Sequence, residues 1–260
     1  MMLKRTMFVC VSCVALAVAG RARAESFSAA KIKEAREKAA KSVVVPENTP
    51  EGWSKSRVNP TKLVDSFNPL RVRKDFVLRA YVFREEGNGN GVVWALPLNA
   101  EFPEPKDCPT LENHLRKAPK PSEALDDVME AIEGDNSAWS YLAASLLRRE
   151  FSEFGAVWHG SRWSTHTVLD DDPWKGAKSD DLAMERPNSE PSKWKWLEDR
   201  PKSHAPEVKI EKDHVTVTFY TYSGLTKERI YQHVDTYRPG KYRPKVVEKA
   251  IAEGPAGFAF

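Results

Sequence analysis

Two stretches near the C-terminus, residues 215–222 and 229–237, carry the side chains with the clearest chemical potential. Both alternate between polar and apolar residues, which predicts β-strands whose successive side chains point to opposite faces of a sheet. His233 and Asp235 are two positions apart and therefore share a face. Because a carboxylate can orient a histidine that acts as a general base, these two residues are our candidate catalytic pair.

The same alternation predicts a polar face around this pair. If the apolar residues of 215–219 face the core together with Ile230 and Val234, tyrosine and histidine side chains gather on the opposite face. Tyrosine combines an apolar ring with a hydroxyl group, which suits a sugar or another flat polar ligand. An ordinary solvated face is the alternative, because threonine and tyrosine are common in strands of any function. The candidate ligand-binding residues are His214, Tyr220, Tyr222, Arg229, Tyr231 and Tyr237.

A second group of polar residues contains His159 and His166, followed by aspartates at 170–172. Histidines and carboxylates are the usual ligands of a zinc ion. On a regular strand or a tight hairpin, however, the two imidazoles would lie too far apart to share an ion, and only a bulge would bring them together. We therefore expect no metal and no other cofactor, with His159 and His166 as the residues to check. A hairpin that stacks Trp158 and Trp163 is the structural alternative.

Residues 1–24 have the pattern of an export signal. Lys4 and Arg5 precede the apolar run from Met7 to Gly20, and Ala22-Arg23-Ala24 has the small residues that a signal peptidase accepts. A bilayer span needs about 20 apolar residues, so this run is too short for a permanent transmembrane anchor. We expect an exported protein of the bacterial periplasm or the cell exterior that begins at Glu25.

Loss of this segment changes the charge and the cysteine content. Residues 1–24 contain four basic residues and no acidic one, so their removal lowers the formal net charge from +3 to −1. This balance argues against a nucleic-acid partner, which would need a strongly basic surface. Cys10 and Cys13 leave with the signal, so Cys108 remains alone and no intramolecular disulfide can form.

The remaining patterns predict a mixed structure. Apolar residues at helical spacing favour helices over 25–43, 122–133 and 136–154, and a proline start with a glycine end favours a further helix over 244–253. The stretch 76–83 predicts a strand that pairs with 91–96 around the glycine and asparagine tract between them.

The fold class that follows is α+β, with an antiparallel sheet of about five to seven strands packed on one long buried helix, and with a helical N-terminal arm. The expected domains are a signal peptide (1–24), a helical arm and irregular linker (25–70) and a single α+β domain (71–260).

Three functions fit these observations, and the sequence leaves open whether the protein is an enzyme. The first is an exported binding or envelope-associated protein of unknown ligand, with a polysaccharide or another envelope component as partner. The second is a hydrolase that acts on an envelope or extracellular polymer, with His233 as base and Asp235 orienting it. The third is a structural protein that docks an unknown protein partner through its N-terminal helix or through residues 170–207.

Overall fold

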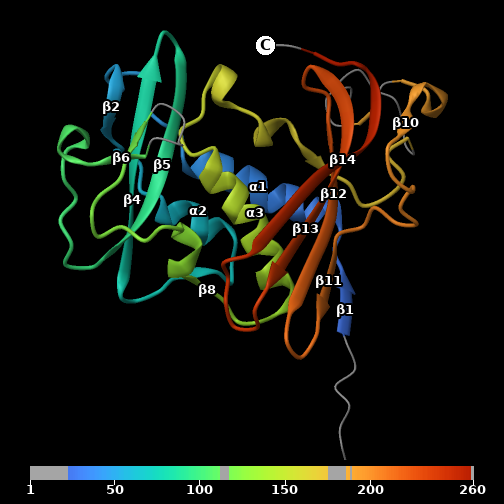
Figure 1. The fold of residues 1–260 in the computed structure, drawn as a ribbon, viewed down its shortest axis with the longest axis horizontal. Coiled ribbons are helices and arrows are strands. Elements are labelled where there is room, and N and C mark those ends of the chain that lie inside the picture. Colours follow the sequence, from blue (N-terminus) through green and yellow to red (C-terminus); the bar gives the residue numbers. More distant parts are fainter. Residues whose placement is uncertain (1–22, 112–116, 175–185, 188, 259–260) are drawn as a thin grey trace, which may run out of the picture.

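The computed structural model describes residues 23–111, 117–174, 186–187 and 189–258 (Figure 1). The protein mixes helices with antiparallel sheets, which confirms the α+β class. In Figure 1 the helices lie between a small sheet on one side and a large sheet on the other. Most of the predicted export signal, residues 1–22, lies outside the described residues. Among the helices described, none has the length and apolar character needed to cross a membrane.

The large sheet has seven strands in the order β1-β11-β12-β13-β14-β10, with β9 paired to β12. All of its strand pairs are antiparallel. The strands are β1 (Arg23–Ser26), β9 (Thr167–Val168), β10 (Lys195–Trp196), β11 (Glu207–Ile210), β12 (Val215–Ser223), β13 (Lys227–Tyr237) and β14 (Lys245–Ala256).

The small sheet contains the predicted hairpin. Its strands are β2 (Gly52–Lys55), β4 (Phe76–Glu85) and β5 (Asn88–Pro97). Glu86 and Gly87 form the two-residue turn between β4 and β5, with φ angles of 49° and 81°. Positive φ at both central residues is the requirement of a type I′ turn, which suits the twist of the two strands. Two further pairs are β3 (Arg71–Val72) with β8 (Ile132–Glu133) and β6 (Thr110–Leu111) with β7 (Ala118–Pro119).

In the described part of the chain, three α-helices lie between the two sheets: α1 (Ala29–Ser42), α2 (Thr61–Ser66) and α3 (Ala138–Ser152). Ser137 accepts a hydrogen bond from the Ser140 amide and so caps the start of α3. The 3-10 helices among the described residues are η1 (Pro105–Asp107), η2 (Val128–Ala131), η3 (Trp158–Gly160), η4 (Trp163–Thr165) and η6 (Pro191–Lys193).

One apolar cluster joins α1, α3 and both sheets. It includes Ile32 of α1, Leu146 of α3, Phe219 of β12 and Leu78 of β4, all of which are fully or almost fully buried. Since α3 contacts β5 on one side and β11 and β12 on the other, it fixes the position of the large sheet against the rest of the chain.

Two segments that the sequence predicts to be α-helices have other structures. Residues 245–256 form the strand β14, which pairs with β13 over most of its length, so sheet pairing overrides the helical preference of its lysine, glutamate and alanine residues. In 122–133 the helix is limited to the 3-10 turn η2. The Leu125 amide bonds to the Ala95 carbonyl, so the chain follows β5 there instead of coiling.

Candidate functional site

The register between β12 and β13 decides where the predicted site residues lie. Phe219 pairs with His233, and Val217 pairs with Asp235. Directly paired residues of antiparallel strands share a face, so His233 and Asp235 lie on the apolar face of the sheet, which packs on α3. Both side chains are fully buried. The prediction that they lie on a solvated polar face is therefore wrong.

The other predicted ligand-binding residues are divided between the two faces. The face of β13 that carries His233 also carries Arg229, Tyr231 and Tyr237. On β12, Tyr220 and Tyr222 lie on the opposite face of the sheet. Three of the four tyrosines, Tyr220, Tyr222 and Tyr237, are buried. The structure thus brings no single tyrosine-rich binding face together.

His214 and Arg229 lie at separate places on the surface. His214 contacts Asp213 at 2.8 Å and Glu211 at 2.5 Å in the turn between β11 and β12. Arg229 pairs with Glu253 at 3.1 Å.

The two histidines considered as metal ligands are also separated. His159 is exposed in η3, whereas His166 is buried directly after η4. Among the residues described, no group of three or more histidine, cysteine, aspartate or glutamate side chains could hold a metal ion. Trp158 and Trp163 lie in two successive 3-10 turns, so the expected hairpin is absent from this described segment.

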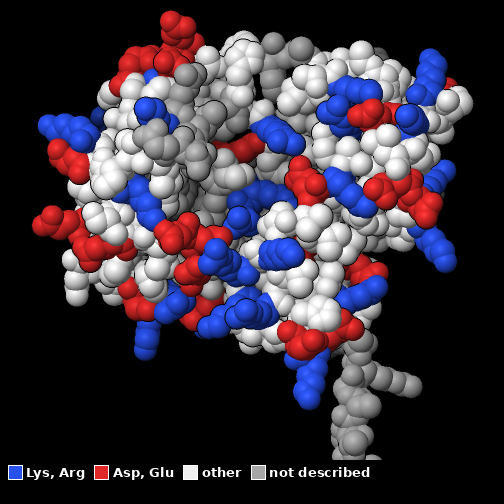
Figure 2. Space-filling view, viewed as in Figure 1, with Lys and Arg blue, Asp and Glu red and all other residues white. Residues whose placement is uncertain are grey.

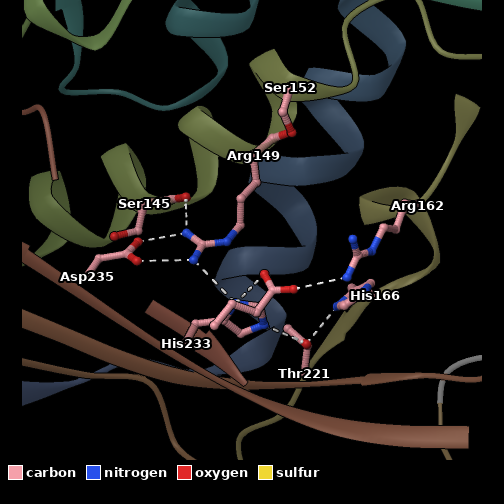
Figure 3. Close-up of polar contacts among 9 residues, drawn as sticks. Ser145, Arg149, Ser152, Arg162, His166, Thr221, His233 and Asp235 are labelled. Atoms are coloured by element: carbon pink, nitrogen blue, oxygen red, sulfur yellow. Dashed lines mark hydrogen bonds and ion pairs between the residues drawn. The ribbon is translucent and has the colours of Figure 1, made fainter. Parts of the chain in front are cut away.

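Asp235 does not orient His233, because Arg149 of α3 binds it. Arg149 Nη1 lies 2.7 Å from Asp235 Oδ2, and Nη2 lies 3.1 Å from Oδ1. The same guanidinium donates to the Ser145 carbonyl at 2.8 Å (Figure 3). This two-pronged ion pair satisfies the buried carboxylate and explains how an aspartate can face the core.

A continuous chain of hydrogen bonds starts at His233 instead. His233 Nε2 lies 2.8 Å from the Thr221 hydroxyl, which lies 2.8 Å from His166 Nδ1 (Figure 3). On its other side, His233 Nδ1 lies 3.3 Å from the carboxylate of Glu248 on β14. Four side chains from three strands and one loop are therefore linked in series.

Two groups face His233 Nδ1, and they favour opposite tautomers. Glu248, at 3.3 Å, can only accept a hydrogen bond, whereas Arg149 Nη2, also at 3.3 Å, can only donate one. The tautomer of His233 sets the direction of the hydrogen bonds that run through Thr221 to His166. We call the series Glu248–His233–Thr221–His166 the hydrogen-bond relay.

Burial fixes the protonation states of the relay. Loss of solvent, together with the neighbouring His233, lowers the pKa of His166 to about 3, and burial also lowers the pKa of His233. Both imidazoles are therefore neutral at neutral pH. The hydrogen bond from His233 lowers the pKa of Glu248 to about 2, so this residue is a carboxylate.

A cavity of about 250 Å³ opens onto the relay. Figure 2 shows the surface hollowed between the two sheets, where acidic and basic side chains meet. Glu248 is 33% exposed and Arg162 is 70% exposed, with 3.4 Å between their charged groups. We call this space the Glu248 cavity. It is lined by Arg149, Ser152, Glu153, Arg162, Trp163, His166 and Glu248.

The wall of the Glu248 cavity is held firmly. Glu153 accepts hydrogen bonds from the backbone amides of Arg162, Trp163 and Ser164, which ties the loop before η4 to the end of α3. Trp163 Nε1 donates to Glu150 at 2.9 Å. Its indole also packs edge-on to the His233 ring, with 5.8 Å between ring centroids. Such fixed side chains are typical of a site that is formed before its ligand arrives.

Sequence reasoning missed Arg149, Thr221, Arg162 and Glu248. A signal existed for Arg149, since it follows Leu142 and Leu146 on the same face of an apolar helix, where an unpaired charge would be costly. Glu248 could not be found, because its segment was expected to be helical.

Comparisons with protein-family models, with curated proteins and with solved structures found no match. The chemistry of the cavity is therefore the basis for its interpretation.

Proposed function

We propose that this is an exported protein of the bacterial periplasm or cell exterior that binds a small polar ligand in the Glu248 cavity. Its ligand class is a single sugar residue, free or as part of an envelope polysaccharide. In this proposal α3 is the long buried helix that carries Arg149 beneath the cavity, and α1 is the N-terminal helical arm.

The observation that carries the proposal is the composition of the cavity wall. It combines a carboxylate acceptor (Glu248), the exposed guanidinium donor of Arg162 and a neutral histidine (His166) in one hollow, whose wall is held by the buried Trp163. Sugars need both donors and acceptors for their hydroxyl groups, and these side chains supply them. The volume of about 250 Å³ is below the range of about 300–1,000 Å³ that holds drug-sized molecules, which favours a ligand of one ring.

Titration calorimetry with single sugars tests the binding site. Galactose, N-acetylglucosamine and glucuronic acid would be titrated into the wild-type protein and into the Glu248→Gln variant. We expect at least one sugar to bind, with an affinity at least about tenfold lower in the variant, because a hydrogen bond to a charged group contributes about 1.5–3 kcal/mol.

Glu253→Gln is the matched control for this experiment. Glu253 lies on the same strand, but it pairs with Lys227 and Arg229 away from the cavity. Binding that is absent for all three sugars, or weakened equally by both variants, would contradict the proposal.

Export is tested separately. The full chain would be produced in a bacterial host, followed by cell fractionation and mass spectrometry of its N-terminus. A periplasmic or secreted product that begins at Glu25 supports the proposal, and a cytoplasmic product that keeps Met1 argues against it.

The hydrogen-bond relay favours a second function, hydrolysis of an envelope or extracellular polymer. Its base would be His166, in the tautomer whose Nε2 carries the lone pair, in place of the expected His233 and Asp235. A pKa of about 3 makes His166 a weak base, whereas efficient general bases have a pKa near the working pH. Binding is therefore the first proposal. Hydrolysis predicts that His166→Gln abolishes turnover of a bound polymer while its affinity changes little.

A further inference from the structure

A second and larger cavity lies at the opposite end of α3. Its volume is about 1050 Å³, and it is bounded by β8, by the turn between β11 and β12 and by the turn between β13 and β14. Figure 2 shows basic side chains gathered where β8 and the β13–β14 turn meet in Figure 1. The basic residues of its lining are Arg73, His214, Arg238, Lys241, Arg243 and Lys245. We call this space the basic cleft.

The β13–β14 turn that carries most of these charges is held in place. The Gly240 amide donates to the Tyr141 hydroxyl at 2.8 Å, and the Tyr242 hydroxyl lies 2.8 Å from Ser140 Oγ. The Tyr242 and Tyr141 rings stack with 5.0 Å between centroids. The turn is therefore anchored to the start of α3, and its cations project from a rigid base.

Three of the basic residues are available for a ligand. Arg243 contacts Glu130 and Asp127, and Arg73 contacts Asp75 at 2.7 Å. By contrast, Arg238, Lys241 and Lys245 are exposed and have no ion-pair partner in the described part of the chain. Placing three unpaired cations along one cleft concentrates positive potential there.

We propose that the basic cleft binds an acidic polysaccharide whose sugars carry carboxylate groups, that is, a polymer of uronic acids. The unpaired cations would bind carboxylates on successive sugars. Glu130, Glu133 and Asp213, which also line the cleft, would accept hydrogen bonds from sugar hydroxyls. This site is separate from the Glu248 cavity and goes beyond the function proposed for that cavity.

The lining favours such a polymer over a nucleic acid. Duplex DNA carries one negative charge per about 1.7 Å of helix axis, which the three carboxylates of the cleft would repel. Single-stranded nucleic acids are bound by stacking their bases on exposed aromatic rings. Tyr237 and Tyr242, the aromatic residues of this lining, are both buried. A polymer with wider charge spacing and many hydroxyls fits the mixed lining better.

The experiment measures binding of oligogalacturonate to the full chain by titration calorimetry at several salt concentrations. The same oligomer with methyl-esterified carboxylates serves as the uncharged probe. The variant is Arg238→Ala/Lys241→Ala/Lys245→Ala. Its control, Arg57→Ala/Lys195→Ala/Lys202→Ala, removes the same charge from exposed positions outside the cleft.

We expect the wild type to bind the acidic oligomer and not its ester, with affinity that falls as salt rises. The cleft variant should bind at least about tenfold more weakly, and the control variant within about twofold of wild type, since scattered surface charges contribute little. Glu248→Gln should bind it like wild type, which separates this site from the Glu248 cavity. Absent binding, equal loss in both triple variants, or equal affinity for a DNA oligonucleotide would overturn the proposal.

Discussion

Arg149 and Asp235 form a two-pronged ion pair inside the protein, between the central helix and the inner face of the large sheet. The arginine side chain is 8% exposed and the aspartate 0%. Arg149 contacts both Asp235 and His233, with 3.3 Å between its Nη2 and His233 Nδ1, and His233 is linked further to Thr221 and Glu248. The hydrogen-bond relay is therefore tied to α3 through a buried contact.

Removing one partner of this pair should destabilise the fold strongly. Asp235→Ala leaves the Arg149 charge buried without a partner, and breaking a buried ion pair in this way costs about 3–5 kcal/mol. Urea unfolding followed by circular dichroism measures the change. Arg71→Ala, which breaks an exposed pair with Glu133, is the control and should cost at most about 1 kcal/mol. Similar losses in the two variants would refute this account.

Stability should fall in acid because of the buried histidines. The folded state lowers the pKa of His166 to about 3 from an ordinary value of 6.5, so the unfolded chain binds the proton more readily between these values. The free energy of unfolding should therefore be highest above pH 6.5 and decrease as the pH falls toward 3. His233 and Glu248 act in the same direction.

Urea unfolding between pH 7.5 and 4 tests this dependence. His166→Gln should give a shallower fall than wild type. His214→Gln is the control, because contacts with Asp213 raise the pKa of this exposed histidine and give it the opposite sign. An unchanged slope in His166→Gln would show that His166 does not carry the effect.

The turn of the β4–β5 hairpin offers a stabilising substitution. Glu86 has a φ of 49°, a left-handed conformation that costs about 1–2 kcal/mol for an ordinary residue. Glu86→Asn creates the Asn-Gly pair preferred in type I′ turns and should raise the melting temperature by about 2–4 °C. Gly87→Ala should lower it, because alanine would be strained at a φ of 81°. Scanning calorimetry measures the two melting temperatures. If both variants shifted in the same direction from wild type, this account of the turn would be wrong.

Two neighbouring tyrosines should differ in their response to loss of a hydroxyl. Tyr222 donates to the buried carboxylate of Glu228 at 2.9 Å, so Tyr222→Phe should cost about 1–3 kcal/mol. Tyr220 only accepts from Gln232 at 3.1 Å, and Tyr220→Phe should cost at most about 1 kcal/mol. Chemical denaturation of the two variants measures the loss in the free energy of unfolding. Equal losses would show that the hydrogen bond from Tyr222 to Glu228 does not contribute more than the one to Tyr220.

Local patterns in the sequence were sufficient for some elements. The β4–β5 hairpin follows from its apolar strands and the glycine-rich turn, and the strands β12 and β13 follow from alternation. Such signals depend on residues close together in the chain, which sequence reasoning can use.

The pairing of β12 with β13 could not be predicted in the same way. Ser223 of β12 pairs with Arg229 of β13, so each odd-numbered residue of β12 pairs with an odd-numbered residue of β13. The apolar residues Ile230 and Val234 suggested the other face as the core. In the observed register Asp235 and His233 face α3 together with Val217 and Phe219, and Arg149 of that helix, far away in the sequence, binds Asp235. Ile230 packs in a second apolar cluster on the opposite face.

The position of Glu248 could not be predicted from local sequence patterns either. Lys245–Ala256 has helical residues and helix-like ends, yet it pairs with β13 to complete the sheet. The residue that completes the relay was therefore outside the reach of any local pattern.

The first strand of the large sheet has a consequence for the order of events during biogenesis. β1 contains Ala24, paired with Lys209, and Glu25, paired with Val208, so the proposed cleavage point lies inside a hydrogen-bonded strand. A peptidase that cuts after Ala24 must act before this strand docks. In a chain cut there, the Phe27 amide, which bonds to the Pro206 carbonyl, would hold the new end on the sheet. Maturation would thus come first and folding second.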